Sequence, residues 1–317
     1  MIDQLLILIL SVLVLAKAAE WMIQSALRLA AFFHLSEIAV GFLLLSVATS
    51  LPELSIALTS AFSDEVAITV GNVLGANIAD VALVLGITAL VGTVTIRRQD
   101  VNDIIILLII ISLLPLFMLT GFLSAFYGLI LIGIFLLYAY MTLQKRSPSS
   151  SRHHVDARSA VFSAFLFSLG LAIVVVSAQF VVRSAVLLAG MLSISKSVIG
   201  ATVIAWGTTV PELAVNLQAI RTHHSSLALG NILGSALTNL TLILGLAALI
   251  NPLAVQLTPF FSLIVFAFAI NALLLYFVRR HVTIQRKHAL MLLVAYGLFL
   301  LVETFLEFPS LFGMPFG

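Results

Sequence analysis

Three acidic side chains lie inside long apolar stretches of this sequence: Glu53, Asp80 and Glu212. A carboxylate near the middle of a bilayer costs ~2.5 to 3.5 kcal/mol even by the lower estimates. Such a group therefore faces a cavity, pairs with another group or titrates, rather than contacting lipid. No basic residue in the surrounding motifs is available to neutralise these charges. The three carboxylates indicate a site for a bound cation or a proton.

Each glutamate directly follows a proline, Pro52 or Pro211. Proline cannot donate a backbone hydrogen bond and clashes with the carbonyl four residues earlier, here that of Ala48 or Gly207. We expect each helix to open there, which is tolerated at membrane depth mainly where the backbone lines a cavity or is buried. Freed carbonyls, hydroxyls and carboxylates together form the all-oxygen environment that Ca2+ and Na+ prefer. The hydroxyls are those of Thr49, Ser50, Thr208 and Thr209.

The chain contains this arrangement twice, at a constant spacing of 159 residues. Glu53 corresponds to Glu212, and the stretch GNVLGANIAD at 71–80 matches GNILGSALTN at 230–239 without a gap. Asp80 thus corresponds to Asn239. Two glycines four residues apart in each stretch share a helix face and predict close helix packing.

Three polar positions near these motifs have simpler interpretations. For Asn72 and its counterpart Asn231 we favour hydrogen bonds that bridge helices over direct ligation of an ion. Lys17 and Glu20 are three residues apart, a spacing at which they can neutralise each other on one helix.

The elements that position these residues are transmembrane helices. Apolar residues make up 62% of the 317 residues, charged residues only 9%, and the mean hydropathy is +1.23. Apolar runs of about 20 residues, enough to cross the hydrocarbon layer, fill nearly the whole chain. The short alternating segments of a barrel are absent from the sequence. We predict an all-α integral membrane protein with about ten spans: 3–31, 36–60, 66–92, 103–120, 122–143, 160–189, 197–219, 225–250, 258–278 and 288–306.

The duplication divides these spans into two halves of five. The first repeat is predicted at 1–143 and the second at 160–317, joined by a Ser-rich polar linker at 144–159. Because five is odd, the second copy enters the membrane from the opposite face, which makes the repeat inverted. Inverted repeats of transporters place their site near the midplane, where the halves meet.

The loops predict the orientation. If the helices alternate in direction, eleven basic residues fall on the linker side and only Lys196 on the other, so the positive-inside rule puts the linker in the cytoplasm and both termini outside a cell (inner) membrane. The absence of Cys excludes a thiolate metal site, and we expect neither a prosthetic group nor a nucleic-acid partner. The eleven residues are Arg97, Arg98, Lys145, Arg146, Arg152, Arg158, Arg221, Arg279, Arg280, Arg286 and Lys287.

The motifs ATSLPEL at 48–54 and GTTVPEL at 207–213, with the two Gly-Asn stretches, resemble the alpha repeats of the sodium/calcium exchanger family within the cation/Ca2+ exchanger superfamily. The resemblance covers the whole chain and is strongest to the compact prokaryotic ten-helix members. It implies an antiporter, not an enzyme, that exchanges Ca2+ for Na+ by alternating access. It also implies that spans one and six slide against the other helices as the gate.

The resemblance also implies roles for individual residues. Glu53 and Glu212 would chelate Ca2+ together with backbone oxygens of Thr49 and Thr208, and Na+ would compete for overlapping positions. Asp80 and Asn239 would line the middle of the site. The inner Na+ position would comprise Ser46, Thr49, Ser50, Glu53 and Ser235. The outer Na+ position would comprise Ala205, Thr209 and Glu212.

The chain departs from the family pattern at three positions. Members of this type usually carry Ser where this chain has Ala76, Asn where it has Asp80, and Asp where it has Asn239. The number of carboxylates is kept, but one hydroxyl of the outer Na+ position is lost. We therefore expect weakened or altered Na+ coupling, with a proton at Asp80 as a candidate replacement for one Na+.

Three other functions were weighed. A Ca2+/H+ antiporter on the same scaffold would let the same carboxylates alternate between Ca2+ and protons. A passive cation channel is disfavoured, because inverted halves with paired intramembrane glutamates suit alternating occupancy. An intramembrane enzyme is least supported, since neither an H-E-x-x-H motif nor a G-x-S-x-G motif occurs.

Overall fold

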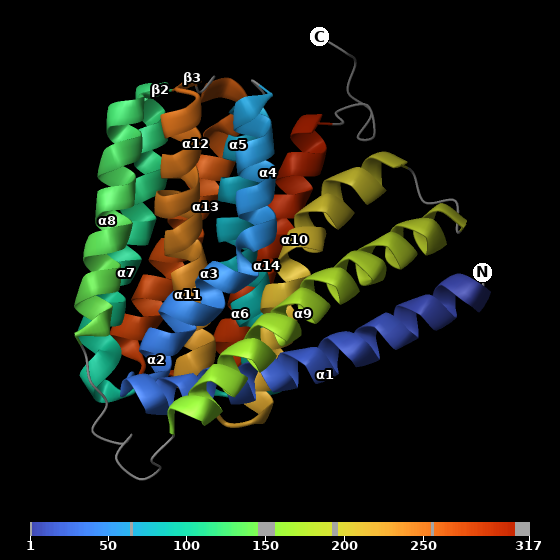
Figure 1. The fold of residues 1–317 in the computed structure, drawn as a ribbon. Coiled ribbons are helices and arrows are strands. Elements are labelled where there is room, and N and C mark those ends of the chain that lie inside the picture. Colours follow the sequence, from blue (N-terminus) through green and yellow to red (C-terminus); the bar gives the residue numbers. More distant parts are fainter. Residues whose placement is uncertain (1, 64–65, 145–155, 192–195, 255–256, 308–317) are drawn as a thin grey trace.

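The computed structural model describes residues 2–63, 66–144, 156–191, 196–254 and 257–307 (Figure 1). Within these ranges eight helices are long and apolar enough to span a membrane, and one further span is bent by 48° between Glu37–Thr49 and Leu51–Phe62. The continuous helix Lys196–Arg221 completes the predicted order of ten. The chain is therefore a multi-pass membrane protein.

The first repeat begins with the long helix α1 (Ile2–Phe33) and continues into two interrupted spans. A π-helical turn interrupts each of these spans, and a 3-10 segment extends the fourth. The second span comprises α2 (Glu37–Val40), η1 (Gly41–Leu45), α3 (Ser46–Thr49) and α4 (Leu51–Phe62). The others are α5 (Val66–Ile78), η2 (Ala79–Val84) and α6 (Leu85–Val91), then α7 (Val101–Leu113) with η4 (Leu114–Thr120), and α8 (Ala125–Leu143).

The second repeat follows the same order. Its π-helical turn η6 begins at Asn239, which is 159 residues after Asp80 in the turn η2. Turns of this kind inside α-helices are frequent at functional sites. The helices are α9 (Ala157–Met191), α10 (Lys196–Arg221), α11 (Ser225–Thr238) followed by η6 (Asn239–Ile243), α12 (Leu244–Ile250), α13 (Leu257–Arg280) and α14 (Arg286–Glu307).

Most of the predicted linker, residues 145–155, lies outside the described residues. Its last three residues, 157–159, belong to helix α9 instead. The reason is the capping side chain of Asp156, whose Oδ1 accepts a hydrogen bond from the backbone N–H of Ser159 at 3.3 Å. An aspartate in this position satisfies one of the free N–H groups of the first turn and starts the helix early.

Two short strand pairs tie the loops together at opposite ends of the helix bundle. Strand β1 (Val94–Thr95) pairs with β4 (Thr283–Ile284), and β2 (Phe122–Leu123) pairs with β3 (Leu253–Ala254). Strands β2 and β3 lie at the top in Figure 1. Strand β3 follows β1 by 159 residues, so corresponding loops of the two repeats lie at opposite ends, an arrangement consistent with inverted repeats.

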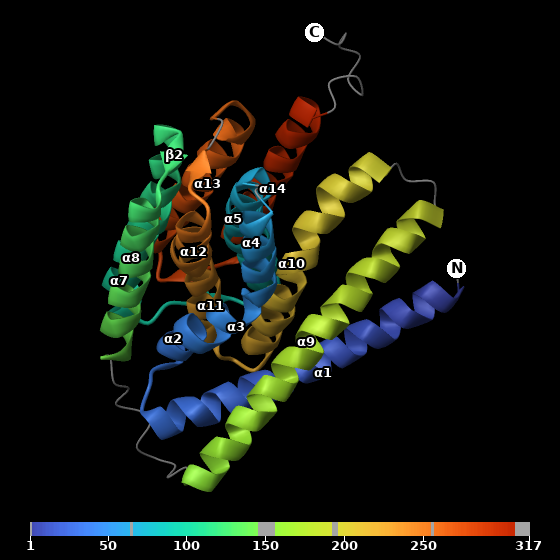
Figure 2. The ribbon, with the colours of Figure 1, turned by 45° about the horizontal axis from the view of Figure 1, so that its top comes forward.

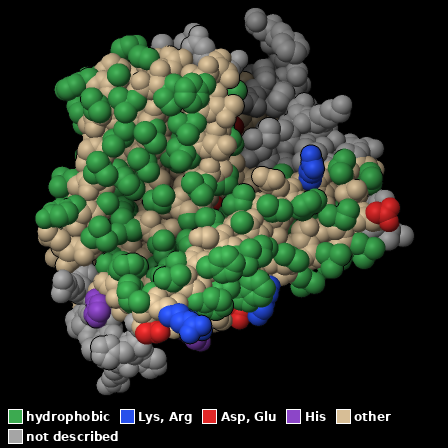
Figure 3. Space-filling model, in the orientation of Figure 1, with side chains coloured by type: hydrophobic (Ala, Val, Ile, Leu, Met, Phe, Trp, Pro, Cys, Tyr) green, Lys and Arg blue, Asp and Glu red, His purple; other side chains and the backbone are tan. Residues whose placement is uncertain are grey.

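We call the end that carries β1 and β4 the basic end. The loops that meet there contain Arg97, Arg221 and Arg286, and Ser225 Oγ donates a hydrogen bond to the Thr93 carbonyl at 3.5 Å across two of them. Apolar side chains cover most of the flank shown in Figure 3, and most charged side chains visible on this face gather along its lower edge. This is the distribution expected of helices that contact lipid along their length.

The helices that carry the Gly-Asn motifs form the centre of the bundle. The most apolar windows of the α5–α6 and α11–α12 spans are 83% buried, against 22 to 28% for α1, α8, α9 and α14. Helices α1 and α9 pack against each other and cross one side of the molecule obliquely (Figure 2). Their contact uses small residues: a methyl group placed on Gly170 would lie 3.3 Å from the Ala18 carbonyl.

Candidate cation site

The three intramembrane carboxylates come from three separate helical segments in the centre of the bundle. Glu53 lies in the first turn of α4, Asp80 in η2 and Glu212 within α10. Each is only 1% exposed. Glu53 is close enough to Asp80 and to Glu212 for their charges to interact, and so is Asp80 to Glu212. Sequence positions 27 and 159 residues away from Glu53 are thus brought into one electrostatic cluster.

Two hydrogen bonds cross between the repeats at this cluster. The Thr208 hydroxyl donates to the carboxylate of Glu53, and the Thr49 hydroxyl donates to that of Glu212. Each threonine belongs to one repeat and each acceptor to the other. The Thr49 hydroxyl also lies 3.5 Å from Asn231 Oδ1. The two signature motifs therefore face each other and share their polar groups.

The backbone opens at the first proline as predicted. Helix α3 ends at Thr49, Ser50 adopts φ −82° and ψ 9°, and α4 starts at Leu51 with Pro52 in its first turn. At Pro211 the predicted break is absent, and this part of the prediction is wrong: α10 runs through the proline without interruption. Proline removes one N–H donor, but a helix long enough to keep its other hydrogen bonds can continue past it.

Several oxygens of the cluster have no hydrogen-bond partner among the described residues although they are fully buried. An unpaired buried oxygen costs about 1–3 kcal/mol, and more if it is charged. Every one of these atoms can coordinate a hard cation, and this fits Na+ or Ca2+. The atoms are Glu53 Oε2, Glu212 Oε2, Asp80 Oδ1, Ser50 Oγ, Ser235 Oγ and Asn239 Oδ1.

Across the described chain, no group of three or more His, Cys, Asp or Glu side chains is close enough to hold a metal ion by itself. A cation at this cluster would therefore need hydroxyl, amide and backbone oxygens in addition to carboxylates. That donor set is typical of Na+ and Ca2+ and unlike the nitrogen and sulfur ligands of zinc.

The remaining predicted residues occupy different environments. Ser46 is fully buried, but its hydroxyl donates to the Phe42 carbonyl of its own helix. Thr209 is buried and engaged with a neighbouring group. Ala205 lies in α10, and its side chain is outside the described part of the chain. Ala76 is buried on α5, one turn before Asp80.

Close packing of glycines sets the distance between the repeats. A methyl group added to Gly230 would collide with the Ile38 carbonyl, and one added to Gly234 would lie 2.6 Å from Ser46 Oγ. Helix α11 therefore approaches the backbone of the kinked span directly. This contact brings Ser235, which follows Gly234, against the first repeat.

The bridging roles expected for the asparagines are confirmed. Asn72 Nδ2 donates to the Glu53 carbonyl at 3.3 Å, and Asn231 contacts Thr49 as described above. Lys17 Nζ lies 2.7 Å from Glu20 Oε2, so this pair does neutralise itself on α1.

One buried polar residue close to the site was missed by the sequence reasoning. Asn216 is fully buried in α10, and its Nδ2 donates to the Glu212 carbonyl at 2.7 Å. Its spacing of four residues from Glu212 was the available signal. The signal was overlooked because the corresponding residue of the first repeat is Ala57, and only polar positions shared by both repeats were considered.

Comparison with known proteins places the chain in a family. The family model described as "Sodium/calcium exchanger protein" matches residues 4–144 and 162–305. The sodium/calcium exchanger MaX1 of Methanosarcina acetivorans is 29% identical over 94% of this chain and 97% of its own length. The inner membrane protein YrbG of Escherichia coli is 30% identical over 78% and 79%, respectively.

A solved structure has the same fold. The sodium-calcium exchanger NCX_Mj, soaked with zero Na+ and Ca2+, superimposes with a TM-score of 0.82 at 26% identity, covering 93% of this chain and 97% of that one. Another structure of the same exchanger, soaked with 2.5 mM Na+ and 0.1 mM Ca2+, gives a TM-score of 0.81. The chain belongs to the sodium/calcium exchanger protein family.

Proposed function

We propose that this protein is a secondary antiporter that exchanges Ca2+ for Na+ at the cluster formed by Glu53, Glu212 and Asp80. The observation that carries the proposal is the set of buried oxygens without partners, which come from both repeats and surround these carboxylates. Because they are oxygens only, the cluster suits hard cations. The names of MaX1 and NCX_Mj support the same pair of ions.

Exchange would follow from mutual exclusion at this cluster. Ca2+ and Na+ require the same glutamates, so binding of one ion displaces the other. With no ion bound, the buried carboxylates repel one another and lack counter-charges, and this makes the empty site costly to enclose. The loaded protein would therefore change its access far more readily than the empty one, as obligatory exchange requires.

Helices α1 and α9 are the proposed moving elements. They pack mainly against each other, and small residues such as Ala18, Ala19 and Gly170 line their contact with the remaining helices and with one another. Small side chains form a smooth surface on which helices can slide. We further propose that the basic end faces the cytoplasm, in accordance with the positive-inside rule, with both termini outside.

A Ca2+/H+ antiporter is the second candidate, and one observation favours it. Ala76 supplies no hydroxyl one turn before Asp80, whose Oδ1 is buried without a partner in the described structure. A protonated Asp80 would take the place of one Na+ in that case. The two candidates use the same site and differ in the coupling ion.

Radioactive Ca2+ uptake into everted membrane vesicles tests the proposal. An imposed Na+ gradient, with high Na+ inside the vesicles, should drive uptake that collapses when the Na+ ionophore monensin removes the gradient. Uptake that responds only to an imposed pH gradient would reject Na+ coupling and select the Ca2+/H+ antiporter. Electrical currents without coupled exchange would indicate a channel instead.

A further inference from the structure

A stripe of residues on α10 leads from the central cluster to the basic end. Glu212, Asn216 and Ile220 are four residues apart, so they follow one another along the same face of the helix. Asn216 is fully buried between a site glutamate and the last turn of α10. Its Nδ2 is engaged with the Glu212 carbonyl, whereas its Oδ1 has no partner among the described residues.

Helix α6 runs beside this stripe in the same direction. A methyl group placed on Gly92, directly after α6, would lie 3.0 Å from Ile220 Cγ1, so the ends of the two helices touch. One turn earlier on each helix are Thr88 and Asn216. Thr88 is also fully buried, and its Oγ1 likewise has no partner among the described residues. Two unpaired oxygens thus lie between α6 and α10, halfway from the carboxylates to the basic end.

The other repeat lacks these polar groups. The residues that correspond to Asn216 and Thr88 are Ala57 in α4 and Ala247 in α12, both fully buried. Packing of two helices at this position therefore needs no polar side chain. The pair Thr88 and Asn216 requires a reason other than the fold, since buried polar atoms without partners in a native protein commonly indicate a water or an ion.

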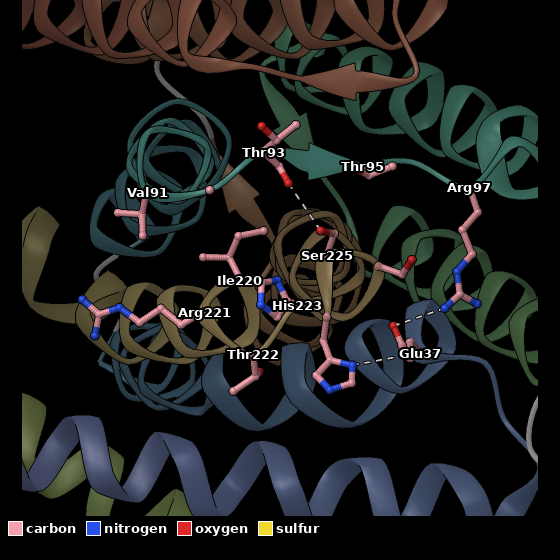
Figure 4. Close-up of a pocket in the computed structure, with 13 residues that line it drawn as sticks. Glu37, Val91, Thr93, Thr95, Arg97, Ile220, Arg221, Thr222, His223 and Ser225 are labelled. Carbon is pink, nitrogen blue, oxygen red and sulfur yellow. Dashed lines mark hydrogen bonds and ion pairs between the residues drawn. The ribbon is translucent and has the colours of Figure 1, made fainter. Parts of the chain in front are cut away.

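Beyond Ile220 and Gly92 the molecule opens into a polar pocket of about 770 Å³ at the basic end (Figure 4). It lies between the end of α10, the start of α11 and strand β1. Glu37 pairs in its wall with Arg97 at 3.4 Å and with His224 at 3.2 Å. The contact of Ile220 with Gly92 separates this pocket from Thr88 and Asn216.

We propose that hydrated cations pass between α6 and α10 on their way from the central site to the basic end, with Thr88 Oγ1 and Asn216 Oδ1 as an intermediate oxygen site for Na+ and Ca2+. Ile220 against Gly92 is the apolar barrier between this site and the polar pocket. The inference rests on the proposed antiport and assigns one of its two access routes. It also makes the route asymmetric, because the alanines of the other repeat offer no such site.

Cysteine accessibility tests the route, and the chain has no cysteine of its own to interfere. Single variants Thr88→Cys and Asn216→Cys would be treated with a membrane-impermeant, positively charged methanethiosulfonate in everted vesicles that are exchanging Ca2+ for Na+. Ala57→Cys and Ala247→Cys are the matched controls. We expect labelling at 88 and 216 at least about tenfold faster than at the controls, because only a thiol that water and reagent reach reacts.

A second pair of variants measures transport. Thr88→Val and Asn216→Leu keep the volume of each side chain but remove its oxygen, and they should lower the exchange rate severalfold while equilibrium Ca2+ binding at the central cluster stays unchanged. Thr88→Ser, which retains the hydroxyl, should restore the rate. A purely structural role would change Ca2+ binding and the rate together.

The proposal is overturned if positions 88 and 216 react no faster than the alanine controls, or if the oxygen-free variants exchange at the parent rate. Failure of the proposed function would be distinct: the unmodified protein would then show no coupled Ca2+ and Na+ fluxes at all.

Discussion

The two repeats share a skeleton and differ in how they build their half of the site. In the first repeat the helix breaks before Glu53, and a carboxylate, Asp80, lies on the π-helical turn; in the second the helix passes Glu212 unbroken, and the turn carries the amide Asn239. The shared glutamates sit at equivalent positions and exchange hydrogen bonds with threonines of the opposite repeat.

This comparison separates what the fold requires from what selects the ion. Proline, glycine and the paired glutamates recur in both repeats, as expected of residues that maintain the scaffold and the common ligands. Asp80, Ala76 and Asn216 have no chemical equivalent in the other half. We infer that the unequal residues set which cation is coupled and by which route it leaves.

The largest effect is expected from the residues that the repeats share. Glu53→Gln and Glu212→Gln should each reduce Na+-driven Ca2+ uptake at least about 100-fold, because each removes a charged ligand from a cluster with no substitute. Glu20→Gln is the control, since Glu20 pairs with Lys17 on α1. If only one of the two glutamine variants lost activity, the repeats would not contribute equally to a common site.

Moving the unshared charge tests the comparison directly. Asp80→Asn should lower uptake about tenfold because the cluster loses one negative charge. The double variant Asp80→Asn with Asn239→Asp restores the number of carboxylates in the other repeat and should recover most of the loss. A double variant as inactive as the single one would show that the position, rather than the number, of carboxylates matters.

Contact between the repeats can be disturbed without touching a ligand. Gly230→Ala pushes a methyl group into the Ile38 backbone and should destabilise the protein by about 1–3 kcal/mol, seen as a lower melting temperature in detergent. Gly133→Ala on α8, where an added methyl group meets no described atom within 4 Å, should leave the melting temperature unchanged or raise it slightly. Equal melting temperatures would argue against direct backbone packing at Gly230.

The smallest effect concerns a single hydroxyl. Ala76→Ser introduces on α5 the group that Ser235 supplies on α11, and it should improve the apparent Na+ affinity about two- to fivefold, consistent with one added hydrogen bond or ligand. The Na+ concentration that half-inhibits Ca2+ uptake measures this change. An unchanged value would remove the missing hydroxyl as an explanation for altered coupling.

Much of the fold could be predicted from the sequence because membrane spans are marked by length and apolarity alone. The span ends differ from the helix ends by a few residues, as at α9, where the cap formed by Asp156 is a local side-chain effect. The strand pairs β1–β4 and β2–β3 could not be foreseen. Two residues are too short to show alternating polarity, and their pairing depends on which loops meet in space.

The site was predictable where it repeats and obscure where it does not. Glu53 and Glu212 stand out because a duplicated charge in an apolar chain is costly twice. The crossed hydrogen bonds with Thr208 and Thr49 depend on how the repeats dock, which no local pattern encodes. The same is true of the unbroken helix at Pro211, since whether a proline ends a helix or is accommodated in it is decided by its neighbours in space.

Calorimetric Ca2+ titration of the purified protein, repeated at increasing Na+ and at several pH values, tests the central claim most directly. A shared site predicts that Na+ weakens the apparent Ca2+ affinity progressively without changing the heat per bound ion at saturation, and that Glu53→Gln and Glu212→Gln abolish binding. Ca2+ binding that is indifferent to Na+ and pH, or that survives in both glutamine variants, would contradict exchange at this cluster.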